Sequence, residues 1–501
     1  MTRHQPSRRA LVAGLAATAG LATTAQAQPA KRPNLVFFLG EGLRNDEFGF
    51  MGNKALKTPN MDALAREGTV FKNAFVTNAL CLPSRASFLT GAYSHTTGAT
   101  TNEEATVPIS FPLVSDLLKA AGYETAFVGK SHVSGALLDH PWDYYFGFRG
   151  QADYLNPTIT ERIGAGEATT KTYRDTYVDD LLTDRTVAWL ERRTGDKPLC
   201  LFVWFWSPHA PFYRPRHLLE RFNGVKVPVP ADFDEDLKDY PGKPRAVANA
   251  ANKIGTTQVF FDDPRSLEEL VKDHWAGVES NDENVGRVAD ALKKRGQWND
   301  TAVMLSSDHG FFLGEHNFYD KRLMYEPSIR VPMIVRWPGR AKAGQSREEM
   351  VLNLDAAPTL LQMAGLPIPA TMQGRSFLPL AEGRAVSDWR KDWLYEYYEY
   401  PGYENVKPNR GVRTERYKLI HYFTEPQEWE LYDLKTDPGE DHNLYGKPEF
   451  ATLTAELKAR LEALRAETHD NYVYKPSRYP MPSVIFGPST TVPQPWRPQS
   501  H

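Results

Sequence analysis

One cysteine stands at the start of a stretch in which a helix and a positive charge follow it directly. The stretch reads Cys81-Leu82-Pro83-Ser84-Arg85, and Pro83 is suited to the first position of a helix. Backbone N–H groups at a helix start, together with a guanidinium in the first turn, favour bound anions and a thiolate. The residues alone therefore indicate either an acidic, reactive thiol or a buried structural cysteine at position 81.

Further ionisable side chains follow four short apolar runs along the chain. The composition of these runs, at residues 34–39, 125–128, 199–206 and 302–305, is typical of buried parallel strands. Because the carboxyl ends of parallel strands meet at the edge of a sheet where ligands bind, we expect the side chains after them to converge. One such residue would indicate only a solvated loop charge. The side chains are Glu41, Lys130, His132, His209, Asp308 and His309.

This set of side chains suits a tetrahedral oxyanion ester. Glu41, Asp308 and His309 offer oxygen and imidazole ligands for a divalent cation, and the group at position 81 would attack the ester. The spacing of these residues does not distinguish a sulfate ester from a phosphate ester. An ordinary hydrogen-bonded pair of Asp308 and His309 at a strand end is a further alternative. The basic side chains that would hold charge and move protons are Arg85, Lys130, His132 and His209.

The elements that must position these residues alternate along the chain. Helical patterns over residues 175–193 and 267–295 separate the apolar runs, which is typical of an α/β fold with a mainly parallel sheet between helices. From residue 393 onward, short aromatic-rich strands with turns precede a helix at residues 448–467. This order predicts a smaller C-terminal subdomain of antiparallel sheet plus helix.

Length and composition exclude several classes of protein. A chain of 501 residues can form one large α/β domain with a smaller partner. A net charge of −3, with no basic run beyond the N-terminus, argues against a nucleic-acid partner. The two cysteines give no disulfide framework, and Cys200 lies within an apolar run, so we interpret it as part of the core.

The N-terminus resembles a twin-arginine export signal. Ser7-Arg8-Arg9 precedes a weakly apolar stretch, and Ala25-Gln26-Ala27 supplies a cleavage site. An ordinary secretory signal with an accidental arginine pair is the alternative. No later apolar segment is long enough to span a bilayer without charges, so we expect no membrane partner. The sequence therefore predicts a periplasmic or secreted protein whose mature chain begins near Gln28.

The Cys81 stretch, continued through Leu89-Thr90-Gly91, resembles the signature of the type I sulfatases of the alkaline-phosphatase-like superfamily. The resemblance covers nearly all of the mature chain. It implies a large, mainly parallel sheet between helices, with a C-terminal antiparallel sheet and helix packed against it. The other matching stretches are Arg32-Pro33-Asn34, Gly129-Lys130-Ser131-His132, His209-Ala210-Pro211-Phe212, Ser307-Asp308-His309-Gly310, Gly314-Glu315-His316, Asp320-Lys321, Arg413-Thr414, Tyr417-Lys418-Leu419 and Leu431-Tyr432-Asp433-Leu434.

The resemblance also implies a role for each site residue. Cys81 would be oxidised by a formylglycine-generating enzyme to formylglycine, whose hydrate attacks sulfur and later expels sulfate by re-forming the carbonyl. Arg85 and Lys130 would hold that group, and His132 would assist breakdown of the sulfated intermediate. His209 and Lys321 would bind the sulfate, and one of them would favour departure of the alcohol. The implied metal ligands are Glu41, Cys81 as formylglycine, Asp308 and His309, with Ca²⁺ the usual metal and Mg²⁺ or Mn²⁺ as alternatives.

One position departs from the family pattern. Relatives commonly carry two adjacent acidic residues after the first strand, whereas this chain has Glu41 followed by Gly42. Phosphonate monoester hydrolases and choline sulfatases also lack the second acid, so its loss would alter the metal site without implying an inactive protein.

The expected function is hydrolysis of a sulfate ester on a sulfated glycan. A phosphonate monoester or phosphodiester hydrolase is the alternative enzyme, and a non-catalytic sulfoglycan-binding homologue is the alternative from another class. Twin-arginine export carries folded protein, so we expect Cys81 to be oxidised before export. The predicted units are a signal at 1–27, a catalytic domain at 31–385, a C-terminal subdomain at 386–471 and a Pro-rich tail at 472–501.

Overall fold

The structure is a computed structural model of the chain. It describes residues 32–102, 111–133, 140–233, 242–254, 265–402 and 404–477. The predicted export signal and all of the predicted tail beyond residue 477 lie outside these residues.

A ten-stranded sheet forms the centre of the fold, in the order β14-β2-β13-β9-β1-β8-β4-β5-β6-β7. The middle of the sheet, from β9 to β5, is parallel throughout, and β13 and β6 flank it in antiparallel orientation. The four predicted strands are the four central ones. The bounds are β14 Gln345–Arg347, β2 Thr69–Phe71, β13 Met333–Arg336, β9 Thr301–Ser307, β1 Asn34–Gly40, β8 Leu199–Trp204, β4 Glu124–Lys130, β5 Tyr144–Phe148, β6 Thr158–Ile163 and β7 Thr169–Thr172.

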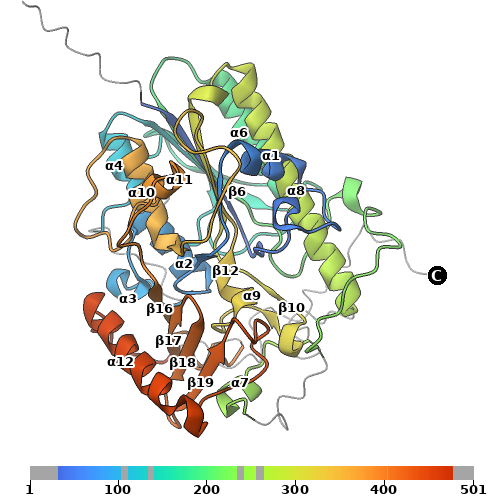
Figure 1. The fold of residues 1–501 in the computed structure, drawn as a ribbon. Coiled ribbons are helices and arrows are strands. Elements are labelled where there is room, and N and C mark those ends of the chain that lie inside the picture. Colours follow the sequence, from blue (N-terminus) through green and yellow to red (C-terminus); the bar gives the residue numbers. More distant parts are fainter. Residues whose placement is uncertain are drawn as a thin grey trace, which may run out of the picture. The chain divides into compact units, whose positions relative to one another are not determined.

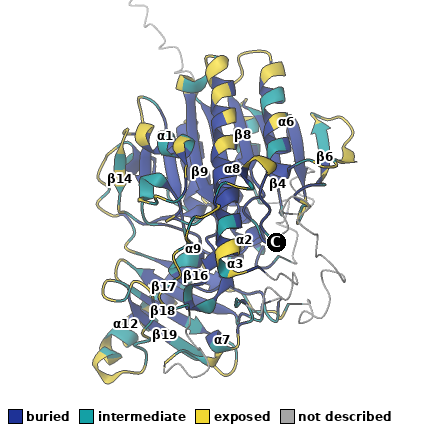
Figure 2. Cartoon of the chain, turned by 90° about the vertical axis from the view of Figure 1, so that its right-hand side faces the viewer, coloured by how far each residue is buried: buried dark blue, intermediate teal, exposed yellow. Residues whose placement is uncertain are grey.

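Helices cover both faces of this sheet, which is why its central strands are continuously apolar (Figure 1). Every residue of β1 is buried, with Phe37 packing into one core and Phe38 into the other. Figure 2 shows that the exposed residues of α6 and α8 lie along the sides turned away from the buried strands. The helices on the Phe38 side are α1 Pro59–Glu67, α6 Val178–Arg192 and α8 Leu267–Lys294, and those on the Phe37 side are α2 Cys81–Thr90, α4 Val114–Ala120 and α10 Ala356–Met363.

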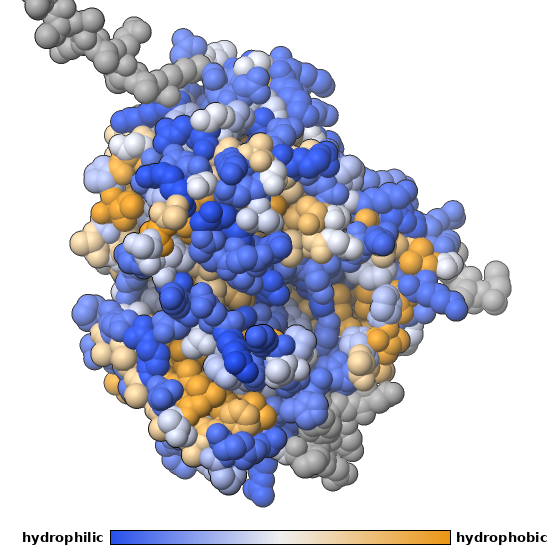
Figure 3. All heavy atoms as spheres, viewed as in Figure 1, coloured by the Kyte–Doolittle hydropathy of each residue, from blue (hydrophilic) through white to orange (hydrophobic). Residues whose placement is uncertain are grey.

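A second, antiparallel sheet of four strands follows in the C-terminal part, and α12 packs against it. Its aromatic residues, such as Trp393 and Tyr395, join the same core as α2, so they serve packing. On the face shown in Figure 3, hydrophilic residues predominate and an apolar patch lies over the region of this sheet and α12. The bounds are β16 Asp392–Tyr397, β17 Asn409–Thr414, β18 Tyr417–Tyr422, β19 Glu428–Asp433 and α12 Ala451–Glu467.

Two smaller sheets, in the orders β12-β3-β15 and β10-β11, and several short helices complete the described fold. Among the described residues, none of the helices is both long and apolar enough to cross a bilayer. The predicted fold class, a mainly parallel sheet between helices with a smaller antiparallel sheet plus helix, is confirmed. The bounds of the short elements are β3 Ala74–Phe75, α3 Ser94–Thr97, α7 Arg245–Ala248, β10 Phe312–Leu313, η5 Glu315–Asn317, β11 Tyr319–Asp320, α9 Glu326–Ile329, β12 Arg330–Val331, β15 Val351–Leu352 and α11 Leu378–Ala381.

Candidate active site

The register of the central strands brings the first carboxylates together. Gly40, the last residue of β1, pairs with Ser307, the last residue of β9. Glu41 and Asp308 therefore leave the sheet side by side at the carboxyl edge. Lys130 ends β4, which is separated from β1 only by β8, so its ammonium reaches the same point.

The helix α2 delivers the cysteine to these carboxylates from the Phe37 face of the sheet. It begins at Cys81 itself, so Pro83 is the third helical residue rather than the first, as the sequence had suggested. Proline fits there because the first four N–H groups of a helix have no partner within the helix. The backbone N–H of Leu82 donates to Oδ1 of Asn102 at 3.0 Å, which fixes the first turn.

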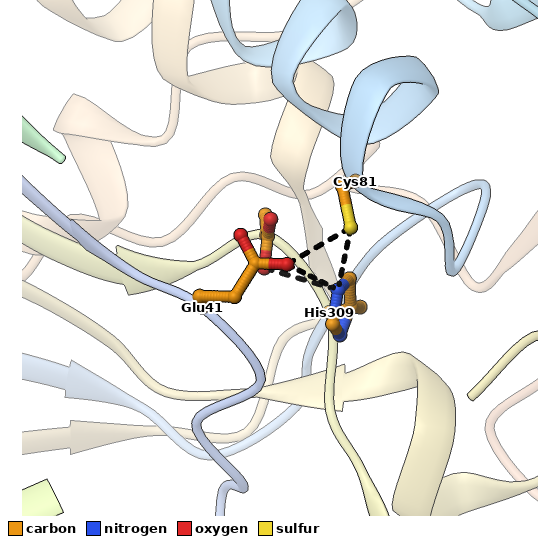
Figure 4. Close-up of side chains that lie close together, drawn as sticks. Glu41, Cys81 and His309 are labelled. Carbon is orange, nitrogen blue, oxygen red and sulfur yellow. Dashed lines mark hydrogen bonds and ion pairs between the residues drawn. The ribbon is translucent and has the colours of Figure 1, made fainter. Parts of the chain in front are cut away.

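Cys81 lies at the centre of a buried group of hard and soft donors (Figure 4). Its Sγ is 2.9 Å from Oε1 of Glu41 and 3.4 Å from Nε2 of His309. Nε2 of His309 is 3.3 Å from Oε1 of Glu41 and 3.4 Å from Oδ1 of Asp308. One donor atom from each of the four residues falls within 4.8 Å of the others, so the group has the dimensions of a cation site.

Two buried cations hold the carboxylates of this group in place. Arg85 donates from Nη2 to Oε2 of Glu41 at 2.6 Å, from Nε to Oδ2 of Asp308 at 2.8 Å, and from Nη1 to the carbonyl of Lys130 at 2.7 Å. The ammonium of Lys130 lies 2.8 Å from Oε2 of Glu41. The two carboxylates are thereby paired with two cations, and all four side chains are fully buried.

This balance shifts the pKa of each member of the group. Burial acts to raise the pKa of Glu41, but Lys130 and Arg85 outweigh it and hold that pKa well below its usual range. Burial and the neighbouring Glu41 raise the pKa of Asp308 to about 7. Burial acts to lower the pKa of His309, but Asp308 and Cys81 together outweigh burial and raise that pKa to about 9.

The thiol is acidic, as its helical position suggested. Burial and Glu41 act to raise the pKa of Cys81, yet Lys130, Lys321 and His309 together bring it well below that of a free thiol. An acidic cysteine among these three basic groups is a site for negative charge. By contrast, burial alone raises the pKa of Cys200, which lies in the core.

His209 and Lys321 face the group from two other loops. Nε2 of His209 is 3.8 Å from Oε1 of Glu41, and its Nδ1 donates to the carbonyl of Ala210 at 2.5 Å. Burial, Lys321 and Lys130 lower the pKa of His209 to about 4, so the imidazole is neutral near pH 7. Burial acts to lower the pKa of Lys321, but Asp320, whose Oδ1 is 3.1 Å from the ammonium, outweighs burial together with Cys81 and Glu41, and the pKa is raised.

His132 is the site residue that follows Lys130 beyond the end of β4. It follows β4 in a left-handed conformation with φ of 48°. Burial and Lys130 lower its pKa, and hydrogen bonding to Cys81 acts in the opposite direction. All nine of the sequence-predicted site residues thus lie at one edge of the sheet.

The structure adds three residues to which the sequence assigned no role. Trp206 stacks under His209 with ring centroids 4.1 Å apart, and its ring lies 4.6 Å from the ammonium of Lys130. Its signal was its place at the end of an apolar run. Asp320 pairs with Lys321 next to it in sequence. Asn102 is distant from Cys81 in sequence and had no local signal.

Gly42 occupies the place of the missing second acid. Its φ is +75°, and a Cβ built there would lie 3.2 Å from the Phe311 ring. Its N–H donates to Oδ1 of Asp308 at 3.2 Å, and Nε2 of His274 lies 3.2 Å from its carbonyl. The backbone of Gly42 therefore supports the carboxylate beside it, and the residue is conformationally specialised.

Comparisons with known proteins agree with this geometry. Residues 33–366 match a family model described as Sulfatase, and residues 314–467 match one described as N-sulphoglucosamine sulphohydrolase, C-terminal. The chain is 34% identical to an N-acetylglucosamine-6-O-sulfatase of Bacteroides thetaiotaomicron over 89% of its own length and 88% of that protein. It is 28% identical to the human N-acetylglucosamine-6-sulfatase over 79% of its length and 72% of that protein.

A solved structure with D-glucosamine-2-N,6-O-disulfate bound as its substrate is similar over nearly the whole fold. The TM-score is 0.80 at 32% sequence identity, covering 88% of this chain and 99% of that chain.

Proposed function

The chain belongs to the sulfatase family, and we propose that it removes the 6-O-sulfate from a glucosamine residue of a sulfated glycan. Hydrolysis of a sulfate ester follows from membership of the family and from the relatives' activities. The choice of sugar and position rests on the two relatives named as 6-sulfatases and on the disulfated glucosamine bound in the similar structure. The observation that carries the proposal is the buried group of Cys81, Glu41 and His309 at the start of α2.

The residues present fit the two groups that the family implies. Arg85 and Lys130 both contact Glu41, the residue that Cys81 contacts, so they can hold an oxygen-bearing side chain at position 81. Glu41, Asp308 and His309 can hold a divalent cation, and hard oxygen donors favour Ca²⁺. A formylglycine at position 81 would supply an aldehyde hydrate as the nucleophile. A bound cation would supply a positive charge beside the sulfate oxygens.

The remaining basic residues would bind the ester and handle its proton. Lys321 keeps its charge because its pKa is raised, so it can bind a sulfate oxygen throughout turnover. His209 is neutral in the free site, with Nδ1–H committed to Ala210 and Nε2 turned toward Glu41. An anionic ester beside Nε2 would raise the pKa of His209, so that this nitrogen carries a proton for the departing alcohol. His132, also neutral, would take up the proton released when sulfate leaves.

The proposal also includes export of the folded protein from the cytoplasm. The paired Arg8 and Arg9 and the small-residue cleavage site support export to the periplasm or beyond through a twin-arginine signal. That route carries folded protein, so a formylglycine-generating enzyme would act on Cys81 in the cytoplasm before export.

The test is sulfate release from defined substrates by the matured protein. We expect glucosamine 6-sulfate and its N-acetyl or N-sulfated forms to be cleaved at position 6, while 3-O-sulfate and N-sulfate on the same sugars are left intact. An aryl phosphonate monoester serves as the competing substrate. Preference for the phosphonate would favour the alternative hydrolase, and tight sugar binding by formylglycine-bearing protein without turnover would favour a binding protein.

A further inference from the structure

A second group of metal-ligand residues lies apart from the Cys81 group. A carboxylate oxygen of Asp232, a ring nitrogen of His316 and a carboxylate oxygen of Asp441 fall within 4.8 Å of one another. Nδ1 of His316 is 3.2 Å from Oδ2 of Asp232. The imidazole is buried, with 1% of its side chain exposed, and the carboxylate of Asp232 is 15% exposed. A buried imidazole and two carboxylates therefore converge on one point.

These three residues come from segments that are far apart in sequence. Asp232 precedes α8, His316 lies in η5, and Asp441 follows β19 of the C-terminal sheet. His316 adopts a left-handed conformation with φ of 53°, which costs about 1–2 kcal/mol in a non-glycine residue. Its ring packs against Tyr325 with centroids 5.1 Å apart, so the direction of the imidazole is fixed.

The group opens on a cavity with an excess of negative charge. Asp232 and Asp441 line this cavity of about 360 Å³ together with Asp46, Glu315 and Glu326. Three of these carboxylates are paired with cations: Asp46 and Glu315 with Arg44, at 2.8 and 2.6 Å, and Glu326 with Arg413 and Lys418, at 3.0 and 3.1 Å. The other arginine of the cavity, Arg330, donates to the carbonyl of Lys72. The remaining negative charge of the cavity therefore lies at Asp232 and Asp441. Among the described residues, no lysine or arginine forms an ion pair with Asp232 or Asp441.

We propose that Asp232, His316 and Asp441 bind a divalent cation of the zinc type, separately from the catalytic group. One imidazole nitrogen and two carboxylate oxygens form a three-ligand set that Zn²⁺ completes with water. Ca²⁺ takes six to eight oxygens, and this set offers two carboxylates and an imidazole, without the further ligand that position 81 adds to the catalytic group. We therefore expect the second group to prefer Zn²⁺. The cation would tie the loop before α8 and η5 to the C-terminal sheet.

The experiment uses the full mature protein saturated with Ca²⁺, titrated with Zn²⁺ by calorimetry and checked by elemental analysis after dialysis. We expect one equivalent of Zn²⁺ to be retained and the melting temperature to rise. His316→Gln and Asp441→Asn should each weaken Zn²⁺ binding by at least about tenfold and remove the rise in melting temperature. Asp441 lies on a partly exposed loop, so Asp441→Asn should fold. This variant therefore tests the site even if His316→Gln fails to fold.

Two further variants distinguish this site from its neighbours. Asp441 also lies near Asp437 and the exposed His442, which form an overlapping group. His442→Gln should bind Zn²⁺ as the wild type does, and so should Asp308→Asn, which alters the catalytic group. Failure of the wild type to retain Zn²⁺ would overturn the proposal. So would loss of binding in His442→Gln or Asp308→Asn with binding intact in His316→Gln.

Discussion

The sulfur of Cys81 lies 2.9 Å from Oε1 of Glu41, a contact between two fully buried side chains. A thiol beside a carboxylate would ordinarily be kept protonated, but three basic groups reverse that effect and make the sulfur a site of negative charge. The contact joins the start of α2 to the end of β1, so residue 81 and the carboxylate are positioned as one unit.

Removing the side chain at position 81 should abolish turnover. We expect Cys81→Ala to lose at least about a thousandfold in kcat, because no other side chain supplies the nucleophile. Cys81→Ser should lose nearly as much in a host that does not oxidise serine. Initial rates of sulfate release measure both variants. Cys200→Ala is the matched control, since that core cysteine should be dispensable for activity. Substantial turnover by Cys81→Ala would contradict the mechanism.

Excess chelator should abolish turnover without unfolding the protein. Arg85 and Lys130 continue to balance the charges of Glu41 and Asp308 when the cation leaves, so circular dichroism should stay native. In Arg85→Gln, chelator should instead lower the melting temperature steeply, because losing the partner of a buried carboxylate costs about 3–5 kcal/mol. Full activity in excess chelator would rule out the metal assignment, and equal chelator sensitivity of the two melting temperatures would rule out the role of Arg85.

Restoring a second acid at Gly42 should fail. Gly42→Asp must place a side chain at φ of +75° against Phe311, so we expect lower stability and no gain in Ca²⁺ affinity. Gly52→Ala is the matched control, because its φ is +99° with nothing within 4 Å of the added Cβ. That control should lose only about 1–2 kcal/mol, the cost of the backbone conformation. Denaturant unfolding and calcium titration report both properties, and tighter Ca²⁺ binding by a stable Gly42→Asp would contradict the account.

The buried pair of His95 and Glu396 should make stability depend on pH. Nδ1 of His95 is 2.6 Å from Oε2 of Glu396, and this carboxylate outweighs burial and raises the pKa of His95 to about 9. The folded protein therefore holds a proton that the unfolded chain releases near pH 6.5. The pair contributes roughly 3 kcal/mol below pH 6.5 and loses it as pH rises through 9.

Denaturant unfolding of the wild type and His95→Gln at pH 6 and pH 9 tests this. The gap between the two proteins should shrink at the higher pH. The exposed pair of His217 and Glu283 offers the control, because His217→Gln should change stability by less than about 1 kcal/mol at either pH. A gap that stays constant from pH 6 to pH 9 would show that His95 is not charged in the fold.

Much of the fold could be predicted because its signals are local. The apolar runs that became β1, β4, β8 and β9 are buried on both faces, and a continuous apolar run is the pattern that such strands leave in sequence. The side chains after them converge because parallel strands share one carboxyl edge.

The parts that could not be predicted depend on tertiary contacts. The hydrogen bond from Leu82 to Asn102 joins the first turn of α2 to a residue beyond the helix, whose path no local pattern specifies. The stacking of Trp206 on His209 depends on the conformation of the turn between them, which the sequence also leaves open. The start of α2 at Cys81 was missed because proline is tolerated at several positions of a first helical turn. The division of the chain into domains and the role of each site residue stay predictions.

The most direct measurement is the mass of the peptide that contains Cys81, taken from active protein purified after export. We predict that it carries formylglycine, which is lighter than cysteine, and that the modified fraction across preparations is proportional to the sulfatase activity. An unmodified thiol at position 81 in fully active protein would contradict the central claim that this cysteine is the precursor of the catalytic group.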